Sequence, residues 1–489
     1  MPSSTLQQKA VSGTLWSGVD IFARQGLQFS ISLVLARLLT PEDYGTVGLM
    51  AIFIALAGVF IDSGFSTALI QRKDITDVDL SSVFYFNVGI ALLAAAILCL
   101  TSSWIAVFYR MPVLKPLTWL LAANVVVSSL GGIQAVILRK SLNFRLQCIL
   151  SIIALIVSGV VAIVLAWQNY GVWSLAIQTL VGTIVGTVLL WFSSSWRPVW
   201  VFSFASIRSL FKFGGFMLLS GLMDTLFNRL NTLVIGKFYS AKDLGFYSRA
   251  DSTSLLPGSI LSGIIGRVAF PIFAAAQQDK ELLKAGLRKA ITLVMMLNIP
   301  IMLGMVVTAR PLVIVLFGAQ WLPCVPYLQI LCLGGTLWPL HLLNLNILLA
   351  QGHSNLFFRI EIIKKIVAIL LMGSACFFGI FTIAWSFVLI GIIGFGINAY
   401  YSGRLLGYGF LRQSIDLLPY GGVALVMAAC AWGVALLPLN APILLLLAQS
   451  LVGAMIYILL CTVLRLQGFL NAWSMIKPLL SKRLMPAKV

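Results

Sequence analysis

The sequence predicts an all-α polytopic membrane protein with about fourteen transmembrane helices. Of its 489 residues, 60% are hydrophobic and only 10% are charged, and the mean hydropathy is +1.02. An ordinary soluble domain has about 25% charged residues, so these side chains are too few to cover a water-facing surface. Apolar segments recur along the whole chain, each near the roughly 20 residues that a helix needs to cross a bilayer. Because hydrocarbon offers no partner for open backbone groups, helices are the expected form of these segments.

Polar and turn-forming clusters divide the chain into fourteen apolar segments. We expect helices near 14–38, 47–70, 83–109, 116–138, 146–167, 172–192, 211–238, 252–275, 290–316, 326–350, 360–379, 381–403, 415–437 and 443–464.

Basic residues outnumber acidic ones, with 33 Lys and Arg against 14 Asp and Glu. When the N-terminus is placed in the cytoplasm, more than two thirds of these 33 cations fall on the cytoplasmic side. The positive-inside rule therefore predicts a multi-pass protein with both termini in the cytoplasm. The net charge of +19 is then a topology signal rather than a sign of nucleic-acid binding, and contact with anionic membrane lipids is its second expected role.

Motifs for metal binding, catalysis and nucleotide binding are missing from the sequence. The seven cysteines lie mostly singly in apolar runs, and His341 and His353 have no ligand cluster around them. No CxxC pair, Walker loop, nucleophile elbow or HExxH motif is present. We expect no metal site, no catalytic residue and no enzymatic activity, and no transport driven by ATP within this chain.

An internal repeat appears when the sequence is shifted by 200 residues. LARLLTPEDYG at 35–45 aligns with IGKFYSAKDLG at 235–245, and Gly45 meets Gly245. Further along, GVWSLA at 171–176 resembles GIFTIA at 379–384, each at the start of the sixth helix of its half. Six helices per half place both halves on the same side of the membrane, as in the parallel repeats of some transporters.

This repeat predicts three parts of the chain. We expect an N-terminal lobe over 1–206, a C-terminal lobe over 207–406, and a last helix pair with a cytoplasmic tail over 407–489. Two lobes with a cleft between them are typical of an alternating-access transporter.

The first and seventh helices carry polar stripes. In the first, Asp20, Arg24 and Gln28 fall on one face, and in the seventh Asp224 and Asn228 share a stripe with Arg229 beside it. Charged residues inside a span cost at least ~2.5–3.5 kcal/mol unless they are paired or face water, so the stripes indicate a wet cleft. The alternative is that the two stripes pair with each other in a buried interface.

Two more charged residues lie inside predicted spans. Asp62 belongs to the second helix, where Asp62-Ser63-Gly64 is equally typical of an N-cap at a helix break. Arg267 belongs to the eighth helix and either faces the cleft or extends toward the membrane surface. We expect Arg24, Gln28, Asn228, Arg229 and Arg267 to bind substrate. The carboxylates Asp20, Asp62 and Asp224 are the candidates for coupling to H⁺ or Na⁺.

Several segments together resemble Wzx-type polysaccharide flippases. They are LARLLTPEDYG at 35–45, DSGFSTALIQRKDIT at 62–76, LRKSLNFR at 138–145, RVAFPIFAAAQQD at 267–279 and VLFGAQWLPCVPYLQILC at 315–332. These flippases belong to the multidrug/oligosaccharidyl-lipid/polysaccharide (MOP) exporter superfamily, and the sequence is most similar to the colanic acid or exopolysaccharide exporter branch.

The resemblance implies a flippase of the bacterial inner membrane. Its expected substrate is an oligosaccharide repeat unit linked by a diphosphate to undecaprenol, moved to the periplasmic leaflet for exopolysaccharide, O-antigen or capsule biosynthesis. A polysaccharide polymerase and a chain-length regulator are the implied partners. One alternative is a cation-coupled drug or lipid exporter of the same superfamily. The other is a membrane-embedded polymerase, against which the short outward loops argue.

Overall fold

A computed structural model of the protein describes residues 23–62, 65–72, 74–141, 143–275, 279–439 and 441–470. Helices are the only regular secondary structure in these residues, which confirms the predicted all-α class. The chain forms two compact units, residues 1–245 (unit 1) and 246–489 (unit 2). The predicted lobes follow the sequence repeat and end at 206 and 406, and that division stays a prediction.

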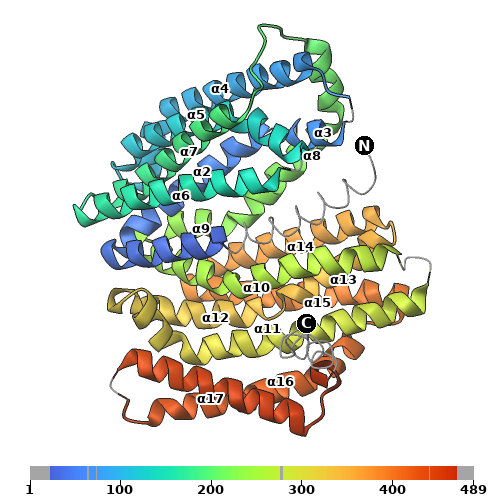
Figure 1. The fold of residues 1–489 in the computed structure, drawn as a ribbon. Helices are drawn as coiled ribbons and strands as arrows, with labels where there is room; N and C mark the ends of the chain where they lie inside the picture. Colours follow the sequence, from blue (N-terminus) through green and yellow to red (C-terminus); the bar gives the residue numbers. More distant parts are fainter. Residues whose placement is uncertain are drawn as a thin grey trace, which may run out of the picture. The chain divides into compact units, whose positions relative to one another are not determined.

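Unit 1 contains a helix over 23–38 and eight further helices that lie wholly within it. These are α2 (Pro41–Asp62), α3 (Phe65–Gln71), α4 (Asp77–Tyr109), α5 (Leu114–Lys140), α6 (Phe144–Trp167), α7 (Val172–Ser193), α8 (Phe204–Asn228) and α9 (Leu230–Phe238). Figure 1 shows α4, α5 and α7 side by side, and α6 packs along α7. Helix α2 crosses this layer and packs against α5 and α8. Helices of this layer line the two cavities described below.

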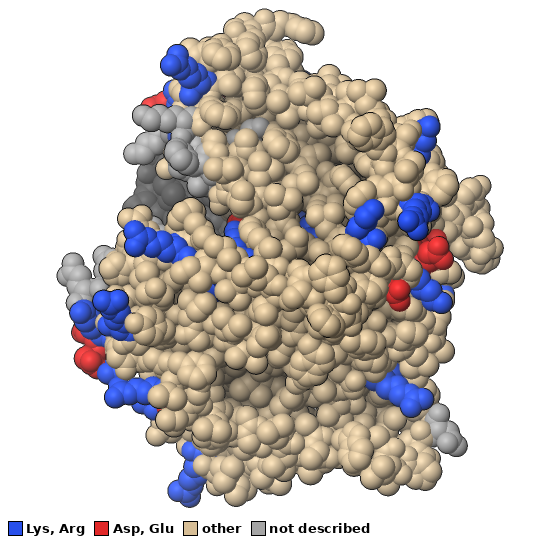
Figure 2. Space-filling model, turned by 180° about the vertical axis from the view of Figure 1, so that it is seen from behind, with Lys and Arg blue, Asp and Glu red and all other residues tan. Residues whose placement is uncertain are grey.

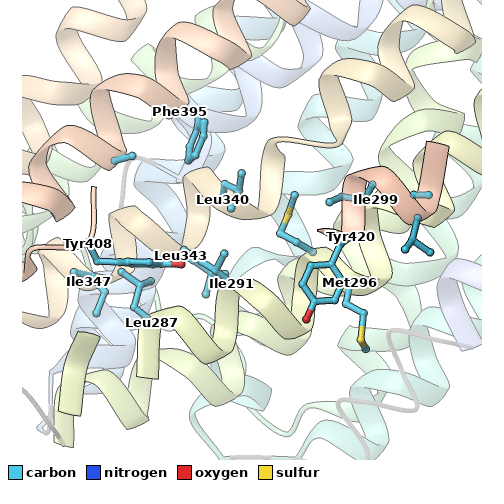
Figure 3. Packing of buried hydrophobic residues seen from close by; sticks show 14 of the residues in the cluster. Leu287, Ile291, Met296, Ile299, Leu340, Leu343, Ile347, Phe395, Tyr408 and Tyr420 are labelled. Atoms are coloured by element: carbon cyan, nitrogen blue, oxygen red, sulfur yellow. The ribbon is translucent and has the colours of Figure 1, made fainter. Parts of the chain in front are cut away.

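Unit 2 is built around one long helix. Its elements are α10 (Ala241–Ala275, which begins in unit 1), α11 (Lys280–Leu316), η1 (Ala319–Cys324), α12 (Val325–Gly335), α13 (Trp338–Ala350), α14 (Ser354–Ala375), α15 (Ile380–Leu406), α16 (Phe410–Gly433), η2 (Val434–Leu436) and α17 (Pro442–Val463). Helix α11 packs against α12, α13, α16 and α17. Leu287 and Ile291 of α11 lie against Leu343 of α13 in the apolar core that Figure 3 shows.

Polar side chains also hold unit 2 together. The Asn344 and Gln413 amides exchange two hydrogen bonds of 3.0 and 2.9 Å between α13 and α16. The guanidinium of Arg288 donates to both carboxylate oxygens of Asp416 at 2.7 and 2.6 Å, and the Tyr408 hydroxyl donates to the same carboxylate. Paired polar groups of this kind hold helices together where the lipid environment offers no competing partner.

The same kind of cap begins α2 and α10, at positions that the repeat aligns. The Thr40 hydroxyl donates to Asp43 at 2.7 Å, and the Ser240 hydroxyl donates to Asp243 at 2.6 Å. In both segments the backbone amide of the aspartate donates back to the hydroxyl, which makes a capping box. The aligned segments 35–45 and 235–245 therefore share their local structure as well as their residues.

The two equivalent helix starts cross at Gly45 and Gly245. A Cβ atom added to Gly45 would lie 1.7 Å from the carbonyl oxygen of Ala241, and one added to Gly245 would lie 1.8 Å from that of Pro41. Small residues allow membrane helices to bring their backbones into contact. Glycine is therefore required at both positions of this crossing.

Ten helices of the described residues are long and apolar enough to cross a membrane. Their large apolar side chains face outward, as with Leu100 and Trp104, which are each 81% exposed. Figure 2 shows that most of the visible surface is uncharged, with the Lys and Arg side chains in separate places. Together these findings establish a multi-pass membrane protein.

Helices also cover the described parts of the other four predicted spans, which lie near 14–38, 211–238, 252–275 and 360–379. These four segments are not among the ten, so the count of fourteen stays a prediction. Three of them hold most of the candidate site residues. A span that lines a polar cavity is expected to have a lower mean hydropathy than a lipid-facing span, because its polar face does not contact lipid.

Candidate functional site

Two adjoining cavities lie inside unit 1. The first, the α6 cavity, has a volume of about 500 Å³ and is lined by the helix over 23–38 together with α5, α6 and α7. The second, the α4 cavity, has a volume of about 490 Å³ and is lined by α2, α3, α4, α5 and α7. Both cavities are lined by Ala135, Thr183, Gly186 and Leu190, so they adjoin one another. Each is within the size range of ligand sites in proteins, about 300–1,000 Å³.

Helical spacing explains the polar lining of the α6 cavity. Gln147, Ser151 and Ser158 lie on one face of α6, while Thr179 and Thr183 lie one turn apart on α7. The Ser158 and Thr183 hydroxyls donate to carbonyl oxygens of their own helices. Their donor hydrogens are thus satisfied inside the membrane, and their lone pairs stay available to accept from a ligand.

Two glycines let α6 and α7 approach each other. A Cβ atom at Gly182 would lie 3.3 Å from the Cβ of Ser158, and one at Gly186 would lie 3.8 Å from that of Ala154. The Gly182-x-x-x-Gly186 spacing therefore serves helix packing, as small residues do between membrane helices. Both glycines also line the α6 cavity, so the same spacing sets the width of the cavity at this point.

Arg24 contributes the charged hydrogen-bond donor of the α6 cavity, and Gln28 contributes an amide beside it. They lie one helical turn apart on the helix over 23–38, and both side chains are exposed where they line the cavity. A guanidinium is planar, keeps its charge when partly desolvated and matches two phosphate oxygens at once. The cavity therefore suits a phosphate group that stays ionised inside the membrane. Asp20, the predicted neighbour of Arg24 one turn away, lies outside the described residues.

A second arginine stands where α5 ends. Arg139 lines the α4 cavity and lies in the last turn of α5, where the helix dipole favours a cation. Its neighbour Lys140 donates to the Arg72 carbonyl oxygen at 2.6 Å, and the Arg72 guanidinium lies 3.9 Å from Asp79. The α4 cavity thus has basic side chains at one end and hydroxyl and amide groups further in.

The remaining candidates fall into two groups. Asn228 is the last residue of α8, and Arg229 sits in the break before α9, so the seventh predicted span is two helices rather than one. Both side chains are exposed, as is that of Asp224, and none of the three lines the α4 or the α6 cavity. Broken helices are common at transporter binding sites, which agrees with a role for this position. The roles of these three residues stay predictions.

Asp62 and Arg267 are placed only by their backbones. Asp62 ends α2 just before α3 begins at Phe65, so a helix break does occur at the predicted place. Arg267 lies in the last third of α10. The side chains of both residues lie outside the described part of the structure, and their roles stay predictions.

Sequence reasoning missed most of the uncharged lining. Gln147 and Gln178 of the α6 cavity and Asn87 and Ser129 of the α4 cavity were not predicted. The available signal was the four-residue spacing of Thr179, Thr183 and Thr187, which places three hydroxyls on one face of α7. Among the described residues no group of three or more His, Cys, Asp or Glu could hold a metal ion.

The model of the family described as "Polysaccharide biosynthesis protein" matches residues 34–326, more than half of the chain. The chain belongs to this family. The matched range contains α2 to α11 and both cavities except Arg24 and Gln28, so the family relationship includes most of the candidate site.

Proteins similar to this chain are named for several polysaccharide pathways. The protein is 26% identical to the teichuronic acid biosynthesis protein TuaB of Bacillus subtilis (strain 168), over 89% of this chain and 90% of TuaB. It is 29% identical to the lipopolysaccharide biosynthesis protein WzxC of Escherichia coli (strain K12), over 80% of each chain. It is 28% identical to the succinoglycan biosynthesis transport protein ExoT of Rhizobium meliloti (strain 1021), over 68% of each chain.

Solved structures confirm the fold of this family member. The lipid II flippase MurJ, in an inward closed conformation, superposes with a TM-score of 0.74 at 18% identity, over 92% of this chain and 98% of MurJ. An inward-facing MATE transporter of the MOP superfamily superposes with a TM-score of 0.60 at 16% identity, over 80% of this chain and 98% of the transporter. The chain therefore shares the fold of these two transporters.

Proposed function

We propose that this protein is a flippase that moves a lipid-linked oligosaccharide across the bacterial inner membrane by alternating access. The observation that carries the proposal is a cavity with an arginine and several hydroxyls inside a bundle of apolar helices, in a family named for polysaccharide biosynthesis. The names of WzxC, ExoT and MurJ support it, because two are biosynthesis or transport proteins and the third is a lipid flippase. These relatives also support transport rather than enzymatic catalysis.

The chemistry of the substrate explains why such a cavity is needed. A diphosphate-linked lipid has apolar chains that stay in the bilayer and a charged, hydroxyl-rich head that hydrocarbon rejects. Arg24 offers the phosphates a charge, and the hydroxyls and amides of α6 and α7 offer the sugars both donors and acceptors. As the head crosses the membrane interior, these side chains can replace the hydrogen bonds that it makes with water.

The experiment that tests this function uses cells from which the gene is deleted. We expect lipid-linked repeat units to accumulate in the cytoplasmic leaflet and surface polysaccharide to be lost, with both restored by the intact gene. Normal polysaccharide without accumulation would contradict the proposal. A second candidate, a cation-coupled drug or lipid exporter, is favoured by the MATE structure alone. It predicts increased drug sensitivity of the deletion strain with polysaccharide unchanged.

We also propose a membrane orientation in which both termini are cytoplasmic. The excess of Lys and Arg in alternate loops supports it. Single cysteines introduced near 112, 241 and 440 should react with an impermeant maleimide from the periplasm, and cysteines near 75, 195 and 283 should not. The label near 283 belongs at the exposed Glu281, because Leu283 is fully buried. A reversed pattern in either half would contradict both the orientation and the parallel repeat. A polysaccharide polymerase and a chain-length regulator are the proposed partners in this membrane.

Transport by this protein is proposed to use a gradient of H⁺ or Na⁺. One elementary charge crossing 100 mV is worth about 2.3 kcal/mol, enough to shift a binding equilibrium substantially. Asp20, Asp62 and Asp224 are the carboxylates proposed to exchange the ion. Flipping in proteoliposomes should therefore respond to an imposed ΔpH or Na⁺ gradient, and Asn at the coupling position should remove the response. Flipping that ignores ΔpH, Na⁺ and potential would exclude the idea.

A further inference from the structure

The α4 cavity differs from the α6 cavity in what lines it. Its polar lining comes from Asn87, Ser128, Ser129 and Thr187, with Ser66 and Thr67 of α3 beside them. Arg139 is the basic side chain at its end, and no carboxylate lines it among the described side chains. A hard cation prefers carboxylate oxygens, so this lining does not suit a metal ion. A purely apolar ligand would leave the hydroxyls and the amide without partners.

Asn87 is the polar side chain of this cavity with unused hydrogen-bonding capacity. It is 5% exposed, it lines the cavity, and its Oδ1 has no hydrogen-bond partner in the described residues. A buried carbonyl oxygen without a partner costs about 1–3 kcal/mol. Such a cost is tolerated where a ligand or water completes the bond during function.

A second buried amide lies at the same level. Helices α4 and α5 are consecutive and antiparallel, and the Trp119 indole donates to the Ser102 hydroxyl at 3.0 Å. Both helices rise by the same distance per residue. Asn87 precedes Ser102 by the same number of residues by which Gln134 follows Trp119, so the two amides lie at the same level. Gln134 is fully buried, and neither its Oε1 nor its Nε2 has a partner within the described residues. Gln134 does not line the α4 cavity, so Asn87 is the amide with unused capacity in the described part of its wall.

We propose that the α4 cavity binds a sugar of the oligosaccharide, while the α6 cavity binds the phosphate, and this rests on the proposed function. Sugar hydroxyls both donate and accept, which matches a described wall with the Asn87 amide and several Ser and Thr hydroxyls. The shared lining of Ala135, Thr183 and Gly186 lets one molecule reach from Arg24 into the α4 cavity. Asn87 is then a specificity-determining residue for the glycan.

The test measures binding of two lipids to the full-length protein in nanodiscs. One is undecaprenyl diphosphate, and the other is the lipid-linked repeat unit extracted from cells lacking this gene. We expect wild-type protein to bind the glycosylated lipid about tenfold more tightly than the bare one, the equivalent of one or two hydrogen bonds. Asn87→Leu should reduce this ratio about three- to tenfold and leave the affinity for the bare lipid unchanged. Ser128→Ala, at an exposed cavity position where little packing is lost, should reduce the ratio by a smaller factor.

Asn124→Leu is the matched control. Asn124 is a buried amide on α5, 5% exposed, with an Oδ1 that also has no partner in the described residues, but it does not line either cavity. Its ratio should equal that of wild type. A wild-type ratio near one, or wild-type ratios in both Asn87→Leu and Ser128→Ala, would overturn the sugar site. Wild-type protein that binds neither lipid would instead contradict the proposed function itself, and the sugar site with it.

Discussion

Gly45→Ala is expected to destabilise the protein strongly, because the added methyl group has no space. It would lie 1.7 Å from the Ala241 carbonyl oxygen, a backbone atom that can move only if the two helices separate. Overpacking of this kind costs about 1–3 kcal/mol or more. We expect the apparent melting temperature in detergent to fall by about 2–6 °C. Gly245→Ala should have the same effect, since its methyl group meets the Pro41 carbonyl oxygen at 1.8 Å.

Gly89→Ala provides the control for this prediction. Gly89 lies in the interior of α4, and a Cβ atom there would have no neighbour within 4 Å. Alanine favours a helix over glycine by about 1 kcal/mol, so this variant should melt at or above the wild-type temperature. If Gly45→Ala and Gly89→Ala have the same melting temperature, then α2 and the start of α10 do not make this close contact in the membrane protein.

Loss of export is the expected result of Arg24→Ala. The substitution removes the guanidinium of the α6 cavity, and each lost charge-assisted hydrogen bond to phosphate is worth about 1.5–3 kcal/mol. Export of polysaccharide should therefore fall at least about tenfold at normal protein level. Arg24→Lys should retain part of the activity, because the charge survives and the planar fork does not. Arg229→Ala tests the same role at the break between α8 and α9.

Two further variants separate recognition from structure. Lys115→Ala removes an exposed cation that lies near the Trp119 ring and lines neither cavity, so export should be unchanged. If Arg24 serves only to pair with Asp20, then Asp20→Ala/Arg24→Ala should restore export. A recognition role predicts that the double variant stays inactive. Wild-type export by both Arg24→Ala and Arg229→Ala would contradict the recognition role.

Much of the local structure of this protein can be predicted from residues that act on their neighbours. Thr40 and Asp43 form a capping box at the start of α2, and the aligned Ser240 and Asp243 repeat it at the start of α10. Gly171 and Gly379, aligned by the repeat, both precede helices with positive φ values of 55° and 111°. These features depend on a few adjacent side chains and on backbone sterics, so they are readable without knowledge of the fold.

The candidate site was only half predictable. Arg24 and Gln28 were predicted because a charge inside a span is costly and must face water or a partner. Gln147, Thr183 and Asn87 carry no charge, and a hydroxyl can bond to its own helix, as Thr183 does. Their cost in lipid is small, so the sequence gives little reason to place them in a cavity rather than against a neighbouring helix.

By itself, the sequence determined that this chain is helical and membrane-embedded, approximately where most of its helices lie, and that segments of its two halves resemble each other. Hydropathy and helix capping depend on residues that are close together in the sequence. They do not depend on how each helix is rotated about its axis. Only the tertiary structure decided that Gly45 and Gly245 meet, that α8 ends at Asn228, and that α4 to α7 enclose two adjoining polar cavities. The rotation of each helix about its axis is set by packing against partners distant in sequence, and that rotation decides which side chains face a cavity.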